Sequence, residues 1–214
     1  MVERSSMIRE RFEAMVRGLE RNPRVTLVDV GFPKPASAPQ IEYAKGQAGG
    51  ALPGGMEEFY RSMNGFRLEW EQRAPEPGRK DEPGRGMIDI LPLYRVLGDW
   101  EGTVWYRDME GGEKYRPVRP LDFFVEEACA ALVQPDGQPL RDEVVYHYLG
   151  ESIEHTGHSF REWMDKLLAA RGYFYWIRTL CAGSQASPEV LSFRKAMPLI
   201  FEDYDDALFQ PKAR

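Results

Sequence analysis

The feature that most constrains the fold of this chain is a change of hydrophobic period at Asn64-Gly65. Over residues 54–63, just after Pro53, apolar side chains recur every three or four positions, which predicts a helix with one buried face. Over residues 66–71, apolar and charged side chains alternate, which predicts a strand with one buried face. Asn and Gly tolerate positive φ, so this dipeptide can end the helix and turn the chain into the strand.

Other periodic segments extend this mixture of helices and strands along the chain. Ser6 is a candidate N-cap, the proline-rich run 33–39 is expected to be an extended connector, and Pro198 is expected to kink the last helix. Helices are predicted over 6–21, from Ser159, within 173–180 and from Ser187, and strands at 25–30, within 87–97, and at 128–133 and 144–150. We therefore predict an α+β fold, a central and mostly antiparallel sheet with helices packed around it.

The domain organisation follows from the same pattern. We interpret residues 1–180 as a single domain and residues 181–214 as a C-terminal helical extension packed on it. Residues 71–86 contain three prolines, three glycines and no large apolar residue, which predicts a mobile surface excursion.

Charge and composition indicate which kinds of molecule this protein can bind. The chain has 34 acidic and 28 basic residues, a net charge of -6, which argues against nucleic-acid binding because phosphates require a basic face. An acidic face suits a basic protein partner instead. No apolar run approaches the roughly 20 residues of a membrane span, the N-terminal segment is charged throughout, and the two cysteines, Cys129 and Cys181, are far apart. We expect a cytoplasmic protein that binds neither nucleic acid nor membrane.

The residue types that perform catalysis do not gather in this sequence. The glycines within 49–55 lack the preceding strand and the Gly-Lys-Ser/Thr ending of a phosphate loop. His147 is expected mid-strand, and His155 and His158 in a glycine-containing turn, without the spacing of a zinc site. Cys129 lies in an apolar segment, which favours packing over an activated thiolate. We therefore expect no enzyme activity, no metal and no cofactor.

Two segments combine aromatic residues with acids, 98–113 and 201–209. In the first, Arg107 is the only arginine, and the second has four acids in six residues and no base. Aromatic residues flanked by unpaired acids suit a binding site for a cationic partner, whereas the alternative is core tryptophans beside solvated loop acids. The predicted partner-binding residues are Asp99, Trp100, Glu101, Trp105, Asp108 and Glu110.

A family resemblance rests on the order of short motifs around the helix-to-strand change. The matching residues are Leu52, Pro53, Phe59, Tyr60, Asn64, Gly65 and Trp70. Their arrangement resembles the signature of the SUKH superfamily, which includes fungal cell-wall-synthesis regulators of the Smi/Knr type and many bacterial immunity proteins. Residues 158–176 are similar to the closing helix of that family, and the resemblance covers roughly residues 41–176. The chain departs from the family in the glycine-rich segment before Leu52, where the family usually has a helix, and in its tail after about residue 180.

The resemblance implies a sheet with helices packed on it and a cleft for partner proteins. It also implies that the protein binds and neutralises a cognate bacterial toxin, often a nuclease with a basic surface, and acts as a monomer or weak dimer. The predicted acids would then pair with lysines and arginines of the toxin, while Trp100 and Trp105 supply apolar anchors. A non-enzymatic regulatory scaffold of the Smi/Knr type is the alternative. A small metal-dependent hydrolase using His155, His158 and Glu151 is the third possibility.

Overall fold

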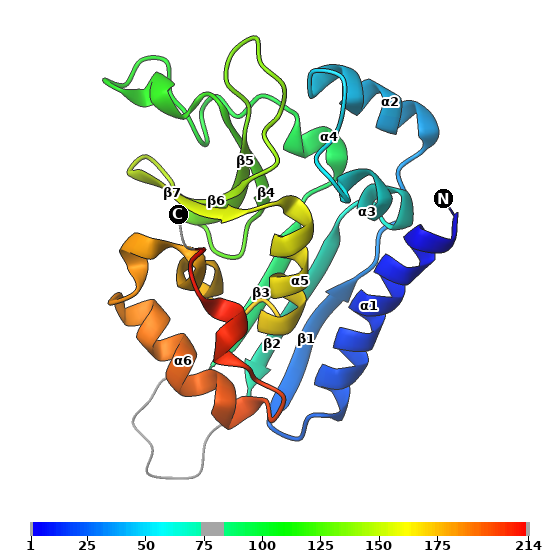
Figure 1. Ribbon diagram of the computed structural model, residues 1–214, viewed down its shortest axis with the longest axis vertical. Helices are drawn as coiled ribbons and strands as arrows, with labels where there is room; N and C mark the ends of the chain where they lie inside the picture. The colour runs from blue at the N-terminus through cyan, green and yellow to red at the C-terminus, as the bar shows by residue number, and fades with distance from the viewer. Residues whose placement is uncertain (1, 74–83, 213–214) are drawn as a thin grey trace.

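The predicted antiparallel sheet is present and has seven strands that lie in chain order (Figure 1). The computed structural model describes residues 2–73 and 84–212, with side chains from residue 7. Each strand is antiparallel to the one before it. The strands are β1 (Val25–Gly31), β2 (Phe66–Gln72), β3 (Arg85–Ile90), β4 (Val118–Asp122), β5 (Ala128–Val133), β6 (Val144–Tyr148) and β7 (Ser152–His158).

Within the described residues, six α-helices pack around this sheet, which confirms the α+β prediction. They are α1 (Val2–Arg21), α2 (Ala38–Gln47), α3 (Met56–Ser62), α4 (Leu93–Val96), α5 (Phe160–Ala170) and α6 (Pro188–Ile200). Figure 1 shows α1 and α5 lying over the β1–β3 part of the sheet. Phe12 of α1 contacts Phe59 of α3 and Phe66 of β2, with ring centroids 5.7 and 4.7 Å apart. These aromatic contacts join helices and sheet in one core.

The change of period at Asn64-Gly65 is confirmed as the end of α3 and the start of β2. Gly65 has a φ of 109°, and a Cβ there would lie 2.6 Å from the carbonyl oxygen of Ile90. Only glycine fits a backbone that is both left-handed and this close to another strand. Along β2, Phe66, Leu68 and Trp70 are buried, and the residues between them are partly exposed, as the alternation predicts.

Several local predictions are wrong. The helix α1 begins at Val2, so Ser6 lies inside it and is not the N-cap. The connector expected over 33–39 ends at Ser37, which caps α2 in a capping box with Gln40. This helix extends to Gln47, into the glycine-rich segment before Leu52 where no helix was expected. Prolines at the first turn are compatible with a helix because the amide that they lack has no intrahelical partner there.

The predicted starts of the last two long helices, at Ser159 and Ser187, are confirmed, and both serines are N-caps. Ser159 accepts a hydrogen bond from Glu162 N and Ser187 accepts one from Val190 N. The segment 173–180 restarts as the 3₁₀ helix η2 (Trp176–Leu180). Of the predicted excursion at 71–86, residues 74–83 lie outside the described residues, and its ends belong to β2 and β3.

The sheet is narrowest between β3 and β4, where only Ile90 and Asp122 are paired among the described residues. The Asp122 carboxylate replaces part of the missing ladder by accepting a hydrogen bond from Asp89 N at 2.7 Å. The chain between these strands forms α4, the loop 98–117 and the 3₁₀ helix η1 (Gly112–Tyr115). This narrow junction therefore carries the segment in which the sequence predicts a binding site.

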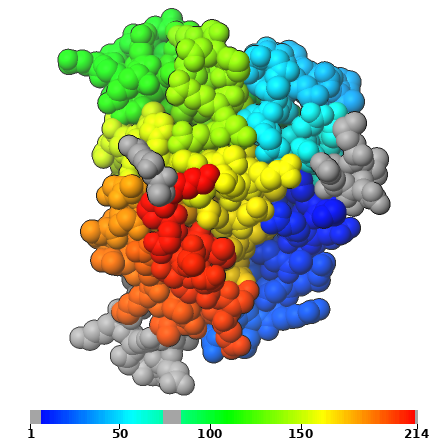
Figure 2. Space-filling view, in the orientation of Figure 1, coloured from blue at the N-terminus to red at the C-terminus, as the bar shows by residue number. Residues whose placement is uncertain are grey.

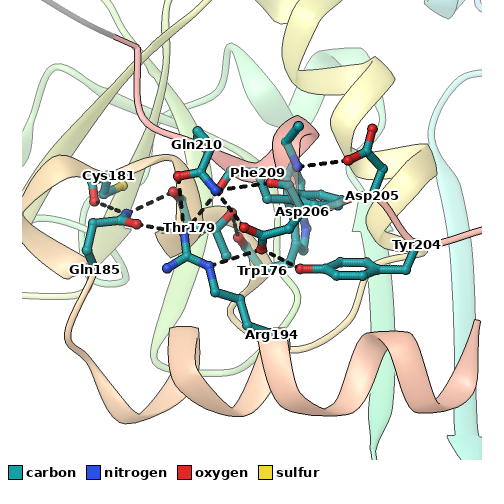
Figure 3. A network of polar contacts seen from close by, with 11 residues as sticks. Trp176, Thr179, Cys181, Gln185, Arg194, Tyr204, Asp205, Asp206, Phe209 and Gln210 are labelled. Atoms are coloured by element: carbon teal, nitrogen blue, oxygen red, sulfur yellow. Dashed lines mark hydrogen bonds and ion pairs between the residues drawn. The ribbon is translucent and has the colours of Figure 1, made fainter.

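The C-terminal segment after α6 is bound to the body by an aromatic cluster and a polar network (Figure 3). Phe209, in the 3₁₀ helix η4 (Asp206–Phe209), is 1% exposed, and its ring lies 4.9 Å from that of Phe193 and 5.7 Å from that of Tyr204. Arg194 of α6 donates hydrogen bonds to Asp206 at 3.2 Å and to the carbonyl oxygen of Phe209 at 3.4 Å. Figure 2 shows this segment, in red, lying against α5, in yellow.

Candidate protein-binding surface

The loop 98–117 is built around two tryptophans that the structure buries. Trp100 is 5% exposed, donates a hydrogen bond through Nε1 to the carbonyl oxygen of Arg95 at 3.0 Å, and lies beneath the Arg95 guanidinium at 4.8 Å. Trp105 is also 5% exposed and donates through Nε1 to Asp99 Oδ1 at 3.2 Å. This burial favours the alternative given above, core tryptophans beside loop acids, over apolar anchors for a partner. Both indoles support the loop from inside.

Two of the predicted acids are engaged within the loop itself. Asp99 accepts hydrogen bonds from Glu101 N and from the Trp105 indole, and the backbone bond in particular holds the pKa of the Asp99 carboxyl below its usual value. Glu101 forms an ion pair with Arg107 at 2.8 Å. Asp99 therefore shapes the turn, and the charge of Glu101 is largely neutralised within the loop.

The other two predicted acids, Asp108 and Glu110, face solvent. Together with Glu113 they have no side-chain hydrogen bond or ion pair within residues 7–73 and 84–212. The same stretch exposes Tyr106 by 39% and Met109 by 58%. We call residues 106–113 the acidic loop. Tyr106 and Met109 were not among the predicted site residues. The only sequence signal for them is that they lie next to the acids.

The second acidic segment, 201–209, differs because all four of its acids have a hydrogen-bond or ion-pair partner. None of them is therefore available in the way that Asp108 and Glu110 are. Glu202 lies 3.5 Å from Arg24, Asp203 lies 2.6 Å from Arg171, Asp205 accepts a hydrogen bond from Ala207 N, and Asp206 accepts one from Tyr204 (Figure 3). The ion pairs of Glu202, Asp203 and Asp206 with arginines outside the segment hold it on the domain.

Exposed aromatic residues also flank a groove between α2 and α4. Tyr43 of α2 is 70% exposed and Tyr94 of α4 is 66% exposed, and both line a cavity of about 150 Å³. We call this cavity the α2–α4 groove. Leu93 and Leu97 supply apolar lining, and Asn64 reaches it from the turn after α3.

A second cavity, of about 300 Å³, adjoins the groove and is lined by three arginines. Arg107 and Arg116 lie 5.9 and 5.7 Å from the centre of the Trp105 ring, and Arg119 extends from β4. We call this cavity the arginine pocket. It shares three lining residues with the α2–α4 groove, which are Gln47, Leu97 and Gly98.

The signature residues around Asn64-Gly65 stabilise the fold. Tyr60 donates to the carbonyl oxygen of Leu91 at 2.9 Å, and Trp70 donates to that of Arg171 at 2.7 Å. Asn64 accepts a hydrogen bond from Leu93 N, so the turn after α3 positions α4. Pro53, Phe59 and Gly65 are buried, and Leu52 is partly buried.

His155 and His158 do not lie in a turn as predicted, whereas His147 lies in a strand as predicted. His155 and His158 belong to β7, where His155 is exposed and pairs with Glu143 at 3.1 Å. His158 is 4% exposed, and burial lowers its pKa to about 4. His147 is buried in β6, and its Nδ1 lies 2.8 Å from the carbonyl oxygen of Ser152. Within the described part of the chain, no three His, Cys, Asp or Glu side chains gather as metal ligands.

Both thiols are buried, and burial raises the pKa of Cys129 and of Cys181. Both side chains therefore stay protonated and serve as packing groups.

Among residues 2–73 and 84–212, no helix has the length and apolar character needed to cross a membrane. Comparisons of the chain with protein-family models, with curated proteins and with solved structures found no match.

Proposed function

We propose that this protein binds a cognate bacterial toxin and neutralises it by covering a basic surface, without catalysing a reaction. The observation that carries the proposal is the acidic loop, where Asp108, Glu110 and Glu113 are exposed and have no side-chain partner in the part of the chain that the structure describes. The other acidic segment has every carboxylate engaged. Charges that remain free beside exposed apolar side chains are available to a cationic protein. The choice of a toxin as that protein rests on the SUKH resemblance.

The exposed side chains near this loop are of the types that interfaces favour. Tyrosine and methionine are enriched in the cores of protein interfaces. Tyr106 and Met109 lie in the acidic loop itself, and Tyr43 and Tyr94 flank the groove that adjoins the arginine pocket. We infer that the acidic loop steers the toxin and that these side chains supply apolar contact once it has arrived.

Co-expression with the toxin tests this proposal. Cells that express the toxin encoded beside this protein should grow when wild-type protein is present, and D108K/E110K should lose much of that protection. The expected loss of affinity is at least tenfold, because each reversal replaces attraction with repulsion at a basic surface.

The matched control is E10K/E20K, which makes the same change in charge on α1. Figure 2 shows α1, in blue, on the side of the molecule opposite the green segment that contains the acidic loop. E10K/E20K should protect as well as wild type. Equal protection by both double variants would contradict the assigned surface, and growth arrest in the presence of wild-type protein would contradict the function itself.

A further inference from the structure

Arg119, in the arginine pocket, is a half-buried cation whose charge is not neutralised by an ion pair. Its Nε donates to Gln134 Oε1 at 3.3 Å, and its Nη1 donates to the carbonyl oxygens of Arg116 and Val118 at 2.7 and 3.2 Å. It forms no ion pair among residues 7–73 and 84–212. These neutral acceptors fix the side chain, and the carboxylates of Asp99 and Asp136 act on its charge only from beyond ion-pair distance. Burial accordingly lowers the pKa of Arg119.

The surroundings of Arg119 add positive charge. Arg116 forms a long ion pair with Asp136, at 3.7 Å. Arg107 forms a shorter ion pair with Glu101, at 2.8 Å. Asp99 is the one carboxylate among the described residues that line the pocket, and it is already bound by a backbone amide and an indole. Three guanidinium groups thus converge on one cavity in a chain whose net charge is -6. Such a concentration of positive charge against the overall sign favours an anion in the cavity.

We propose that the arginine pocket binds the phosphate or carboxylate group of a small organic anion whose remaining atoms lie in the α2–α4 groove. Guanidinium groups present paired N–H donors that match both oxyanions. The rigid placement of Arg119 by Gln134 and the backbone lowers the entropic cost of binding.

The size and lining of the α2–α4 groove indicate what the remaining part of the ligand is. The two cavities, of about 150 and 300 Å³, meet at Gln47, and together they reach the size of small-ligand sites, roughly 300–1,000 Å³. Tyr43 and Tyr94 offer aromatic faces to a flat ring, and Asn64 offers an amide for its polar edge. The ligand class is therefore a ring-bearing anion, for which a nucleoside monophosphate is a suitable probe.

Arg107 belongs both to this pocket and to the acidic loop, but binding of a small anion is measured without the toxin, so this test does not depend on it. Calorimetric titration at constant ionic strength, set with NaCl, compares inorganic phosphate, citrate and AMP. Wild-type protein should bind at least one of them saturably. AMP binding tighter than phosphate assigns a phosphate ligand with a ring, whereas citrate binding alone assigns a carboxylate ligand.

Three variants locate the site. R119K keeps the charge but removes the paired donors, and R107Q changes an exposed residue; each should weaken binding at least tenfold. Y43A should weaken AMP more than phosphate. The control R17Q, on α1, should bind as wild type does. Absence of saturable binding to all three probes would overturn the proposal, and so would binding that R119K and R107Q leave unchanged.

Discussion

Phe209→Ala should lower the free energy of unfolding by about 3–5 kcal/mol, the usual cost of removing a fully buried aromatic side chain. Phe209 is 1% exposed, and its ring packs against Phe193, Tyr204 and Trp176. Removal of the ring would leave a cavity between α6 and η2 that these rigid neighbours cannot fill. The loss would show that the C-terminal segment contributes to the stability of the domain. Urea unfolding followed by tryptophan fluorescence measures it.

The adjacent residue supplies the control. Leu208 is 43% exposed, so Leu208→Ala should change the free energy of unfolding by less than about 1 kcal/mol. Equal effects of the two substitutions would contradict the packing described for the C-terminal segment. A change below about 1 kcal/mol for Phe209→Ala would do so as well.

Asp122→Asn should stabilise the protein at pH 8 by about 2–4 kcal/mol and change its stability little at pH 4. Asp122 is fully buried at the β3–β4 junction, and burial raises its pKa to about 7. Its Oδ1 accepts the Asp89 amide, and its Oδ2 has no partner among the described residues. An asparagine oxygen can accept the same hydrogen bond without ever carrying charge.

The direction of the effect follows from proton binding. Between about pH 4 and pH 7 the Asp122 carboxyl is ionised in the unfolded chain but protonated in the folded one. The folded state therefore binds more protons, and wild-type stability falls as the pH rises through this range. Below about pH 4, the Asp122 carboxyl of the wild type and the side-chain amide of the variant are both neutral. Above about pH 7, only the wild type bears the cost of a buried charge.

Unfolding free energies measured from pH 4 to pH 8 test this prediction. The difference between Asp122→Asn and wild type should grow with pH and level off near pH 8. Asp108→Asn is the control, since Asp108 is exposed and should show no such difference. A difference that is constant across the range would contradict the protonation of Asp122 in the folded state.

Sequence periodicity was sufficient for most of the fold. The alternation over 66–71 and the capping residues Ser159 and Ser187 are local signals, and each corresponds to an element in the structure. The helix α2 was missed because prolines and glycines dominate its ends. The capping box of Ser37 and Gln40 is a sequence signal for this helix, but the neighbouring prolines favoured the prediction of an extended connector.

The candidate site was harder to predict because it depends on which charges meet in space. Sequence alone treats the acids of 98–113 and 201–209 alike. The partners of Asp203 and Glu202 are Arg171 and Arg24, which are distant along the chain. Arg116, whose guanidinium lies over the Trp105 ring, is likewise outside the segment. Tertiary pairing therefore decides which acids stay free, and no local pattern records it.

The most direct test of the central claim is the association rate of this protein with the cognate toxin as a function of NaCl concentration. Attraction between the acidic loop and a basic surface is screened over about 10 Å at 0.1 M salt. The rate should therefore fall at least tenfold between 10 mM and 500 mM NaCl, whereas for D108K/E110K it should be low and should not fall with added salt. A wild-type rate that is flat across this range would contradict the account, as would a D108K/E110K rate equal to that of wild type.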